Sequence, residues 1–356
     1  MTGRANTGVI AEKLLTWYDE NRRDLPWRAR PGERKSAYEI WLSEIMLQQT
    51  TVATVKDYYR AFLKRWPTVE DLAQTSLDDV LHAWQGLGYY ARARNLHKCA
   101  NVVANDLKGK FPRSEKGLRA LPGIGDYTAA ALMALVYGEK ATPVDGNIER
   151  VVARLFRIAT PLPEGKKDIR KRATQLTPDE RTGDYAQAMM DLGATLCSPQ
   201  KPACSLCPLS EDCEAYAKDA PETFPRRKAK PPKPTREAVV YWIERPDGSV
   251  LLRRRPEKGL LGGMMEFPST DWREAPADMK AAQRNAPVSA IWHPLPGEVR
   301  HTFTHFHLVL TVLKGKTRGT PPINGLWCKP QDMSTQALPT VMKKIMRHAL
   351  RLKERK

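Results

Sequence analysis

The sequence predicts two domains, an all-helical domain followed by a smaller α+β domain. At 356 residues the chain is longer than one hydrophobic core usually supports, since domains typically hold roughly 50–200 residues. From residue 8 to about 220, apolar residues recur at the three- and four-residue spacing of helices, with no convincing alternating pattern. Beyond residue 236 the chain contains short apolar runs, two of them separated by a Pro-Asp-Gly turn, which are typical of strands. We therefore expect a helical domain over 1–220 and an α+β domain over 237–356.

The charge balance points to a polyanionic partner. The chain carries 58 lysines and arginines against 40 aspartates and glutamates, a formal net charge of +18 at pH 7. Such an excess attracts nucleic acid through electrostatic steering and counterion release. The longest apolar run, 129–137, is far shorter than the roughly 20 residues that span a bilayer. The first residues lack the pattern of a secretory signal, so we expect a cytoplasmic protein.

A glycine hairpin, LPGIG at 121–125, is the most informative local signal in the helical domain. Gly123 and Gly125 allow backbone N–H groups to approach an anion. A helix that opens near Thr128 presents its N-terminus, which favours negative charge. The same glycines also suit a plain turn between two helices. The spacing alone therefore leaves a phosphate grip and a simple turn open.

A change of composition separates the two domains. Residues 221–236, PETFPRRKAKPPKPTR, are rich in proline and basic side chains, which predicts an extended linker rather than part of a core. After this segment, 238–243, 250–254 and 306–313 predict strands, and 338–350 predicts a closing helix.

Four of the six cysteines are crowded into one short segment. Cys197, Cys204, Cys207 and Cys213 follow the pattern C-x6-C-x2-C-x5-C. In a reducing compartment such thiols are metal or cluster ligands more often than disulfides. Spacing alone leaves a zinc site and an iron–sulfur cluster open, because both take four cysteine ligands.

Two carboxylates stand in contrasting surroundings. Glu44 shares a helical face with Ile40 and Leu47, so we expect it to be buried, with the raised pKa of a general acid. Asp145 precedes a helical pattern over 148–156, where the helix dipole favours its ionised form. An acid and an anion suit cleavage of an N-glycosidic bond, in which the leaving base needs a proton and the sugar becomes positively charged. The alternative is that Asp145 is only an N-cap and Glu44 an ordinary helix residue.

Several segments together resemble the adenine DNA glycosylases of the MutY type, in the endonuclease III superfamily, over essentially the whole chain. These segments are LPGIG, PVDGN with Asp145, SEIMLQQT with Glu44, GLGYYARARNL and the cysteine loop. The resemblance implies a helix-hairpin-helix glycosylase domain whose four cysteines, over 197–213, hold a [4Fe–4S] cluster, followed by a Nudix-like domain that recognises the lesion. It also implies hydrolytic removal of adenine mispaired with 8-oxoguanine or guanine in duplex DNA. We expect a monomer.

The resemblance assigns roles to the residues around the two carboxylates. Glu44 becomes the acid and base that acts on adenine. Asp145 stabilises the sugar cation or binds it transiently, and Asn147 orients that centre. Tyr127 stands where bifunctional relatives carry a lysine that forms a Schiff base, and a phenol cannot do that chemistry. The expected enzyme is therefore monofunctional and leaves an abasic site.

Base flipping requires side chains that enter the duplex and a pocket for the extruded base. By the resemblance, Gln49 enters the duplex, with Leu47 and Thr50 beside it. Tyr89 inserts beside 8-oxoguanine. The residues that correspond to the adenine pocket are Arg23, Leu25, Trp27, Arg28 and Gln187.

The α+β domain resembles the Nudix-like domain of the family but lacks the clustered glutamates of a Nudix hydrolase. Without those carboxylates no Mg²⁺ site for pyrophosphate hydrolysis is evident, so we expect lesion recognition. The expected reading loop contains Phe303, Thr304 and His305, with threonine where the family commonly has serine; the threonine hydroxyl still donates to the modified base. A non-catalytic protein that binds lesions and a nucleotide hydrolase are the alternative functions.

Overall fold

The chain divides into two compact units. The computed structural model describes residues 7–30, 33–218, 220–229, 231–318 and 323–351. Unit 1 comprises Met1–Gln74 and Asn95–Lys230, and unit 2 comprises Thr75–Arg94 and Pro231–Lys356. The sequence predicts a single division near residue 220, whereas Thr75–Arg94, far upstream, belongs to unit 2. Within the described ranges, no helix is both long and apolar enough to cross a membrane.

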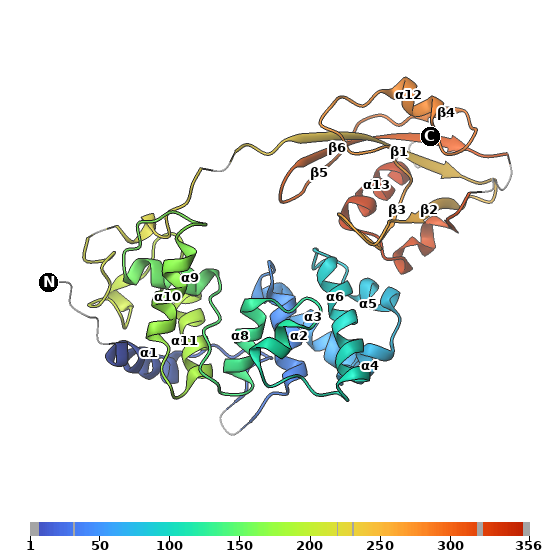
Figure 1. The fold of residues 1–356 in the computed structure, drawn as a ribbon. Coiled ribbons are helices and arrows are strands. Elements are labelled where there is room, and N and C mark those ends of the chain that lie inside the picture. Colours follow the sequence, from blue (N-terminus) through green and yellow to red (C-terminus); the bar gives the residue numbers. More distant parts are fainter. Residues whose placement is uncertain (1–6, 31–32, 219, 230, 319–322, 352–356) are drawn as a thin grey trace. The chain divides into compact units, whose positions relative to one another are not determined.

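Helices make up the regular structure of the first 195 residues, as the periodicity predicts (Figure 1). A π-helical turn, Val102–Asp106, follows α6, and α5 with the start of α6 belongs to unit 2. The helices are α1 (Thr7–Asn21), α2 (Ala37–Leu47), α3 (Val52–Arg65), α4 (Val69–Gln74), α5 (Leu77–Ala83), α6 (Ala91–Asn101), α7 (Glu115–Arg119), α8 (Asp126–Leu135), α9 (Gly146–Leu155), α10 (Lys166–Leu176) and α11 (Thr182–Thr195).

Two groups of helices build unit 1. Helices α1, α9, α10 and α11 pack around a core that includes Leu14, Val152 and Leu192. Burying each such aliphatic side chain contributes about 1.5–3 kcal/mol. Helices α2, α3 and α8 form the second group, and α11 also contacts α8 (Figure 1). This contact brings side chains of α2, α8 and α11 to one cavity.

Unit 2 contains a mixed sheet whose strand order, among the described residues, is β3-β2-β1-β6-β4; β5 also pairs with β6, and β7 with β2. The long strands β1 and β6 run parallel, from Thr235 opposite His307 to Glu244 opposite Lys316. The strands are β1 (Thr235–Glu244), β2 (Val250–Arg254), β3 (Met265–Glu266), β4 (Trp292–Pro294), β5 (Val299–Thr302), β6 (His307–Lys316) and β7 (Leu326–Cys328). The three predicted strands are confirmed as β1, β2 and β6, and the closing helix is α13 (Thr340–Arg351).

Each face of the sheet has its own core because side chains alternate along β1. Val240 and Trp242 lie in the cluster that includes Met342 of α13. Tyr241 lies on the opposite face, in the cluster that includes Ala282 of α12 (Met279–Arg284), and its hydroxyl donates to the carbonyl of Ala282 at 2.8 Å. The sequence prediction did not include α12.

The segment between the domains is partly anchored, contrary to the prediction of an extended linker outside any core. Phe224 is buried in the core of unit 1. Arg154 Nε donates to its carbonyl at 3.2 Å, and the amide of Leu162 donates to the carbonyl of Arg226 at 2.8 Å. The high content of proline and charged residues predicted a linker, but Phe224 within it is buried and attaches this part of the segment to unit 1.

Candidate active site

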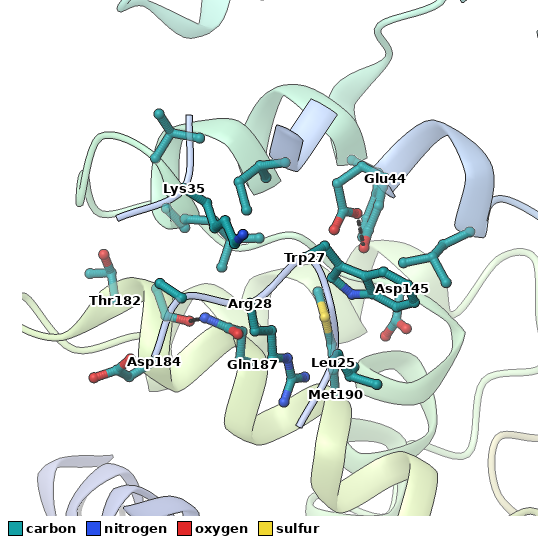
Figure 2. A pocket seen from close by; sticks show the side chains of 18 of the residues that line it. Leu25, Trp27, Arg28, Lys35, Glu44, Asp145, Thr182, Asp184, Gln187 and Met190 are labelled. Atoms are coloured by element: carbon teal, nitrogen blue, oxygen red, sulfur yellow. Dashed lines mark hydrogen bonds between the residues drawn. The ribbon is translucent and has the colours of Figure 1, made fainter. Parts of the chain in front are cut away.

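A cavity of about 860 Å³ opens in unit 1 between α2, α8, α9 and α11. Both predicted carboxylates, Glu44 and Asp145, line it, together with Tyr127 and Asn147. All five residues of the predicted adenine pocket line it as well: Arg23, Leu25, Trp27, Arg28 and Gln187. Figure 2 shows Glu44 and Asp145 at one end of the cavity and Gln187 farther along it. The structure therefore brings together residues that are up to 164 positions apart in the sequence.

Glu44 lies on α2, whose start is fixed by a capping box. The amide of Glu39 donates to Ser36 Oγ at 3.1 Å, and the amide of Ser36 donates to Glu39 Oε2 at 2.8 Å. Such a cap stabilises a helix by about 1 kcal/mol. Glu44 is 5% exposed, as its apolar helical face predicts.

Burial raises the pKa of Glu44 from 4.5 to about 7. The hydroxyl of Tyr127 donates to Glu44 Oε2 at 2.8 Å and opposes this rise, because a hydrogen bond to a carboxylate favours the charged form. The nearby charge of Asp145 raises the pKa, and that of Arg28 lowers it. Glu44 thus exchanges its proton near neutral pH, as a residue that acts as both acid and base requires.

Tyr127 sits in the first turn of α8 and acts as a hydrogen-bond donor. Burial, followed by the charges of Glu44 and Asp145, raises its pKa well above 10. Its phenol therefore stays protonated at neutral pH. This places a neutral, hydrogen-bonding hydroxyl beside Glu44, in contact with the carboxyl and unable to form a Schiff base.

Asp145 is the N-cap of α9. Its Oδ1 accepts from the amide of Ile148 at 2.7 Å, and its Oδ2 accepts from Asn147 Nδ2 at 3.0 Å. Burial nevertheless raises the pKa of Asp145 above its usual 3.8, although these N–H donors and Arg150 lower it. The hydrogen bonds at the helix start favour the ionised form, as predicted, but burial has the larger effect on the pKa.

Arg150 holds Asn147 in one orientation and was not foreseen from the sequence. Asn147 Oδ1 accepts from Arg150 Nη2 at 2.9 Å, which leaves Asn147 Nδ2 to donate to Asp145. Arg150 Nε donates to the carbonyl of Cys197 at 2.7 Å. Its position three residues after Asn147, on the same side of α9, was the only sequence signal for it.

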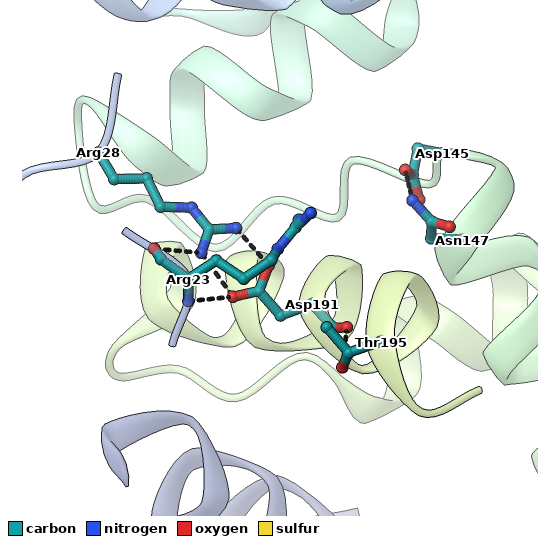
Figure 3. Close-up of polar contacts among 6 residues, drawn as sticks. All are labelled: Arg23, Arg28, Asp145, Asn147, Asp191 and Thr195. Carbon is teal, nitrogen blue, oxygen red and sulfur yellow. Dashed lines mark hydrogen bonds and ion pairs between the residues drawn. The ribbon is translucent and has the colours of Figure 1, made fainter. Parts of the chain in front are cut away.

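Asp191 is a second residue that the sequence prediction missed. It is 0% exposed, and its carboxylate accepts two bonds from Arg28, at 2.5 and 2.7 Å, and two from Arg23, at 2.5 Å from Nε and 3.1 Å from the backbone amide (Figure 3). Burial favours the neutral acid, but the two arginines outweigh it and hold the pKa of Asp191 below its usual value. Its place four residues after Gln187, on the same face of α11, was the available signal.

The glycine hairpin joins α7 to α8 at the edge of unit 1. Gly123 has φ of +78°, and a Cβ there would lie 2.8 Å from Asn95 Cβ, so a side chain is excluded. Gly125 is the N-cap of α8 and has open space around it. Gly125 and Asp126 at the start of α8 are exposed, so a ligand can approach this helix end. The Asp126 carboxylate there pairs with Arg119 at 2.9 Å.

The segment after α2 lies at the rim of the cavity. Leu47, Gln49 and Thr50 line the cavity. Gln49 is exposed and has φ of +57°, an uncommon conformation for a residue with a side chain. The amide of Thr50 donates to the carbonyl of Leu47 at 3.3 Å, which stabilises the turn that presents Gln49.

The four clustered cysteines lie in the loop that follows α11, and all are free thiols. Among the described residues, no three histidine, cysteine, aspartate or glutamate side chains converge closely enough to hold a metal ion. Burial raises the pKa of Cys207 to about 12; a hydrogen bond from the backbone at Leu209 opposes this rise, and the other three cysteines of the cluster add to it. Buried Arg154 donates to Cys197 Sγ at 3.3 Å. By its chemistry, this donor set fits an iron–sulfur cluster.

Within unit 2, the predicted reading loop lies beside Tyr89. The hydroxyls of Tyr89 and Thr304 are 2.6 Å apart, and Tyr89 is 47% exposed. Phe303 stacks on Trp272, with ring centroids 5.7 Å apart, so it supports the loop from the core side. His305 is exposed. The structure thus gathers a phenol, a hydroxyl and an imidazole on one surface of unit 2.

Two family models match the chain. The model of the HhH-GPD superfamily base excision DNA repair protein matches residues 42–179, and the model of the NUDIX domain matches residues 239–348. These matches agree with the helical and mixed-sheet units described above.

Relatives match over nearly the whole chain. The adenine DNA glycosylase of Homo sapiens is 36% identical, over 96% of this chain and 74% of the relative. The adenine DNA glycosylase of Buchnera aphidicola subsp. Schizaphis graminum is 32% identical, over 95% of this chain and 98% of the relative. A solved structure of a thermostable thymine-DNA glycosylase has a TM-score of 0.53 and 34% identity, over 60% of this chain and 97% of that one. A trapped endonuclease III–DNA covalent intermediate, with a TM-score of 0.52 and 22% identity over 62% of this chain and 99% of that one, shares the fold.

Proposed function

Because the chain belongs to the adenine DNA glycosylase family, we propose that it removes adenine paired with 8-oxoguanine or guanine in duplex DNA and leaves an abasic site. The observation that carries this proposal is the pair of buried carboxyl groups in one cavity. Glu44, with a pKa of about 7, can hold a proton at neutral pH, and Asp145 lies in the same cavity with N–H donors on both carboxylate oxygens.

The reaction assigns a different task to each carboxyl group. Protonated Glu44 gives its proton to the adenine as the bond between N9 and C1′ breaks, and the bonding electrons leave with the base. The Asp145 carboxylate faces the positive charge that forms on the sugar. Glu44, now ionised, takes a proton from the water that adds to C1′. Because Tyr127 offers no amine, no Schiff base forms and the DNA strand stays intact.

The adenine pocket is shaped by apolar and cationic side chains. Leu25 and Trp27 are 5% exposed and line the cavity, so they offer a flat apolar surface to a base. Gln187 supplies an amide that can both donate and accept. Arg28 is fixed by its two bonds to Asp191, so it meets the base without losing further side-chain freedom.

The DNA would be held and opened by two features at the edge of the cavity. The N–H groups after Gly123 and Gly125 are suited to a phosphate of the backbone. Exposed Gln49, presented beside Leu47 and Thr50, is suited to fill the space that the flipped nucleotide leaves. Unit 1 thus offers a grip and a wedge close to its cavity.

Discrimination of the opposite base is proposed to lie in unit 2. Tyr89 offers an aromatic ring for stacking, and Thr304 and His305 offer polar groups for the edge of 8-oxoguanine. In the absence of DNA the hydroxyls of Tyr89 and Thr304 bind each other, so recognition would exchange this bond for bonds to the lesion.

The four cysteines of the loop are proposed to hold a [4Fe–4S] cluster. Four protein thiolates would complete the coordination of the cluster, which supplies a structural cross-link for the loop. Cys197 would be oriented by Arg154, which donates to its sulfur and to the carbonyls of Ser198 and Pro199. Iron and sulfide analysis of anaerobically purified protein tests this assignment, and a protein with zinc but neither iron nor sulfide would contradict it.

The test of the proposed function is a cleavage assay on duplexes that carry adenine opposite 8-oxoguanine, guanine or thymine. We expect base release opposite 8-oxoguanine and guanine, with strand breaks that appear only after alkali. The Glu44→Gln variant should bind the same DNA without releasing adenine. Tight binding by the unaltered protein without base release would instead identify a non-catalytic protein that binds lesions.

A further inference from the structure

The cavity of unit 1 is larger than the nucleoside that the proposed function places in it. Its volume is about 860 Å³. Even at about 30 Å³ per non-hydrogen atom, which is the volume of a whole water molecule in the liquid, a purine base takes up at most about 300 Å³ and a deoxyadenosine at most about 540 Å³. At least about a third of the cavity volume therefore lies outside the flipped nucleoside.

The cavity extends along one face of α11. Asp184, Gln187 and Met190 line it at three-residue intervals, which places them on one side of the helix. At 1.5 Å per residue, this row is about 9 Å long. Figure 2 shows Thr182 and Asp184 at the opposite end from Asp145, with Gln187 between them. The cavity thus has a catalytic end, at Asp145, and a distal end, at Thr182 and Asp184.

The orientation of the base follows from the proposed function, on which this inference rests. Asp145 faces the sugar, so N9 of the adenine points toward Asp145. In a purine, N9 and the amino group at position 6 lie at opposite ends of the ring system. The amino group therefore points along the cavity toward Gln187, and the part of the cavity beside Thr182 and Asp184 lies beyond it (Figure 2).

This part of the cavity, here named the distal chamber, is bounded by residues 134–138, Lys35, Thr182 and Asp184. Its wall at 134–138 includes alanine, leucine, valine and tyrosine side chains. The charged groups beside these side chains have partners: Arg181 bonds Asp184 at 2.9 Å, Lys35 bonds Glu39 at 3.0 Å, and Arg113 lies over the ring of Tyr137, 5.3 Å from its centroid. A hydrocarbon group would therefore meet aliphatic and aromatic side chains next to charged groups that already have partners.

We propose that the enzyme also accepts adenine that carries an alkyl or arylmethyl group on its 6-amino nitrogen, with that group bound in the distal chamber. A secondary amine keeps one N–H, which can still donate to the amide oxygen of Gln187. The bond that breaks remains N9–C1′, Glu44 still protonates the leaving base, and water still adds to C1′. The substituent changes only the part of the base farthest from the reacting bond.

The test compares duplexes with adenine, N6-methyladenine or N6-benzyladenine opposite 8-oxoguanine under single-turnover conditions. We expect the substituted bases to be released within about tenfold of the rate for adenine, the range of a small change in an apolar pocket. Asp184→Trp should fill the distal chamber and slow release of N6-benzyladenine by about a hundredfold, while adenine is released at close to the normal rate. Asp184→Ala is the matched control, because it removes the same bond to Arg181 but leaves the chamber open.

The outcomes separate this inference from the proposed function. If adenine is released but N6-benzyladenine is not, the distal chamber does not admit substituents and the inference fails alone. If Asp184→Trp slows both bases equally, or neither, the substituent is not bound beside Asp184 and the inference also fails. If no adenine is released from any duplex, the proposed function fails first.

Discussion

Replacing Glu44 with glutamine is expected to abolish adenine release and to stabilise the folded protein above pH 7. The pKa of Glu44 rises from 4.5 in its ordinary state to about 7 in the folded chain. Its native carboxyl therefore binds a proton more tightly than the unfolded one does. The contribution of this group to stability is fully present below about pH 4.5, is lost as the pH rises to about 7, and stays absent above that pH.

The size of this effect follows from the two pKa values. Each pH unit between them corresponds to about 1.4 kcal/mol, so the ionised carboxyl lowers the free energy of unfolding by about 3 kcal/mol at pH 8. Glutamine carries no charge and retains an oxygen that can accept the bond from Tyr127. For a unit of this size, the melting temperature of Glu44→Gln should rise by about 6–12 °C at pH 8.

Thermal unfolding of the unaltered protein and of Glu44→Gln, followed by helical circular dichroism at pH 4.5 and pH 8, measures this difference. The two proteins should melt at nearly the same temperature at pH 4.5, where both side chains are neutral. Equal melting temperatures at pH 8 would refute the reasoning, because ionisation of Glu44 would then not lower the free energy of unfolding. A loss of stability at both pH values would show that the amide does not fit the site.

Three further predictions concern the neighbours of Glu44 and the reading loop. Tyr127→Phe removes a hydrogen bond that favours the Glu44 carboxylate, so the loss of single-turnover activity at alkaline pH should move upward by about 1–2 pH units; a downward shift would contradict the role of this bond. Asp191→Asn leaves the charge of Arg28 uncompensated, which lowers the pKa of Glu44. The loss of single-turnover activity at alkaline pH should therefore begin at a lower pH, and the free energy of unfolding should fall by about 3–5 kcal/mol. An unchanged pH profile would show that Arg28 does not act on Glu44. Thr304→Val, compared with Thr304→Ser, should lower cleavage opposite 8-oxoguanine by about tenfold and leave cleavage opposite guanine unchanged; equal losses on both duplexes would place Thr304 outside the recognition of 8-oxoguanine.

The long elements of the fold could be predicted from the sequence because their periodicity is local. The apolar run over 238–243 lies within β1 (Thr235–Glu244), and the apolar run over 306–313 largely coincides with β6 (His307–Lys316). Strands such as β3 (Met265–Glu266) contain too few residues to show any alternation. The assignment of Thr75–Arg94 to unit 2 depends on contacts across the fold, which helical spacing does not encode.

The residues of the candidate site also fall into two groups: some could be predicted from local sequence, and others depend on tertiary contacts. Glu44 was predictable because its apolar helical neighbours already indicate burial. Asp145 was predictable as an N-cap, but its raised pKa was not, because the burial that causes it comes from packed helices elsewhere in the chain. Asp191 and Arg150 were missed because each acts on a partner that only the tertiary structure supplies.

Asp191 explains how a cavity rich in arginine can keep Glu44 protonated near neutral pH. Arg28 alone would draw the pKa of Glu44 downward, since a positive charge favours the carboxylate. The buried carboxylate of Asp191 bonds the same guanidinium, at 2.5 and 2.7 Å, and its negative charge opposes the effect of Arg28 on Glu44. Burial of Glu44 then remains the dominant influence on its pKa. The cavity can therefore use arginine to hold a base and still keep a carboxylic acid that is ready to protonate it.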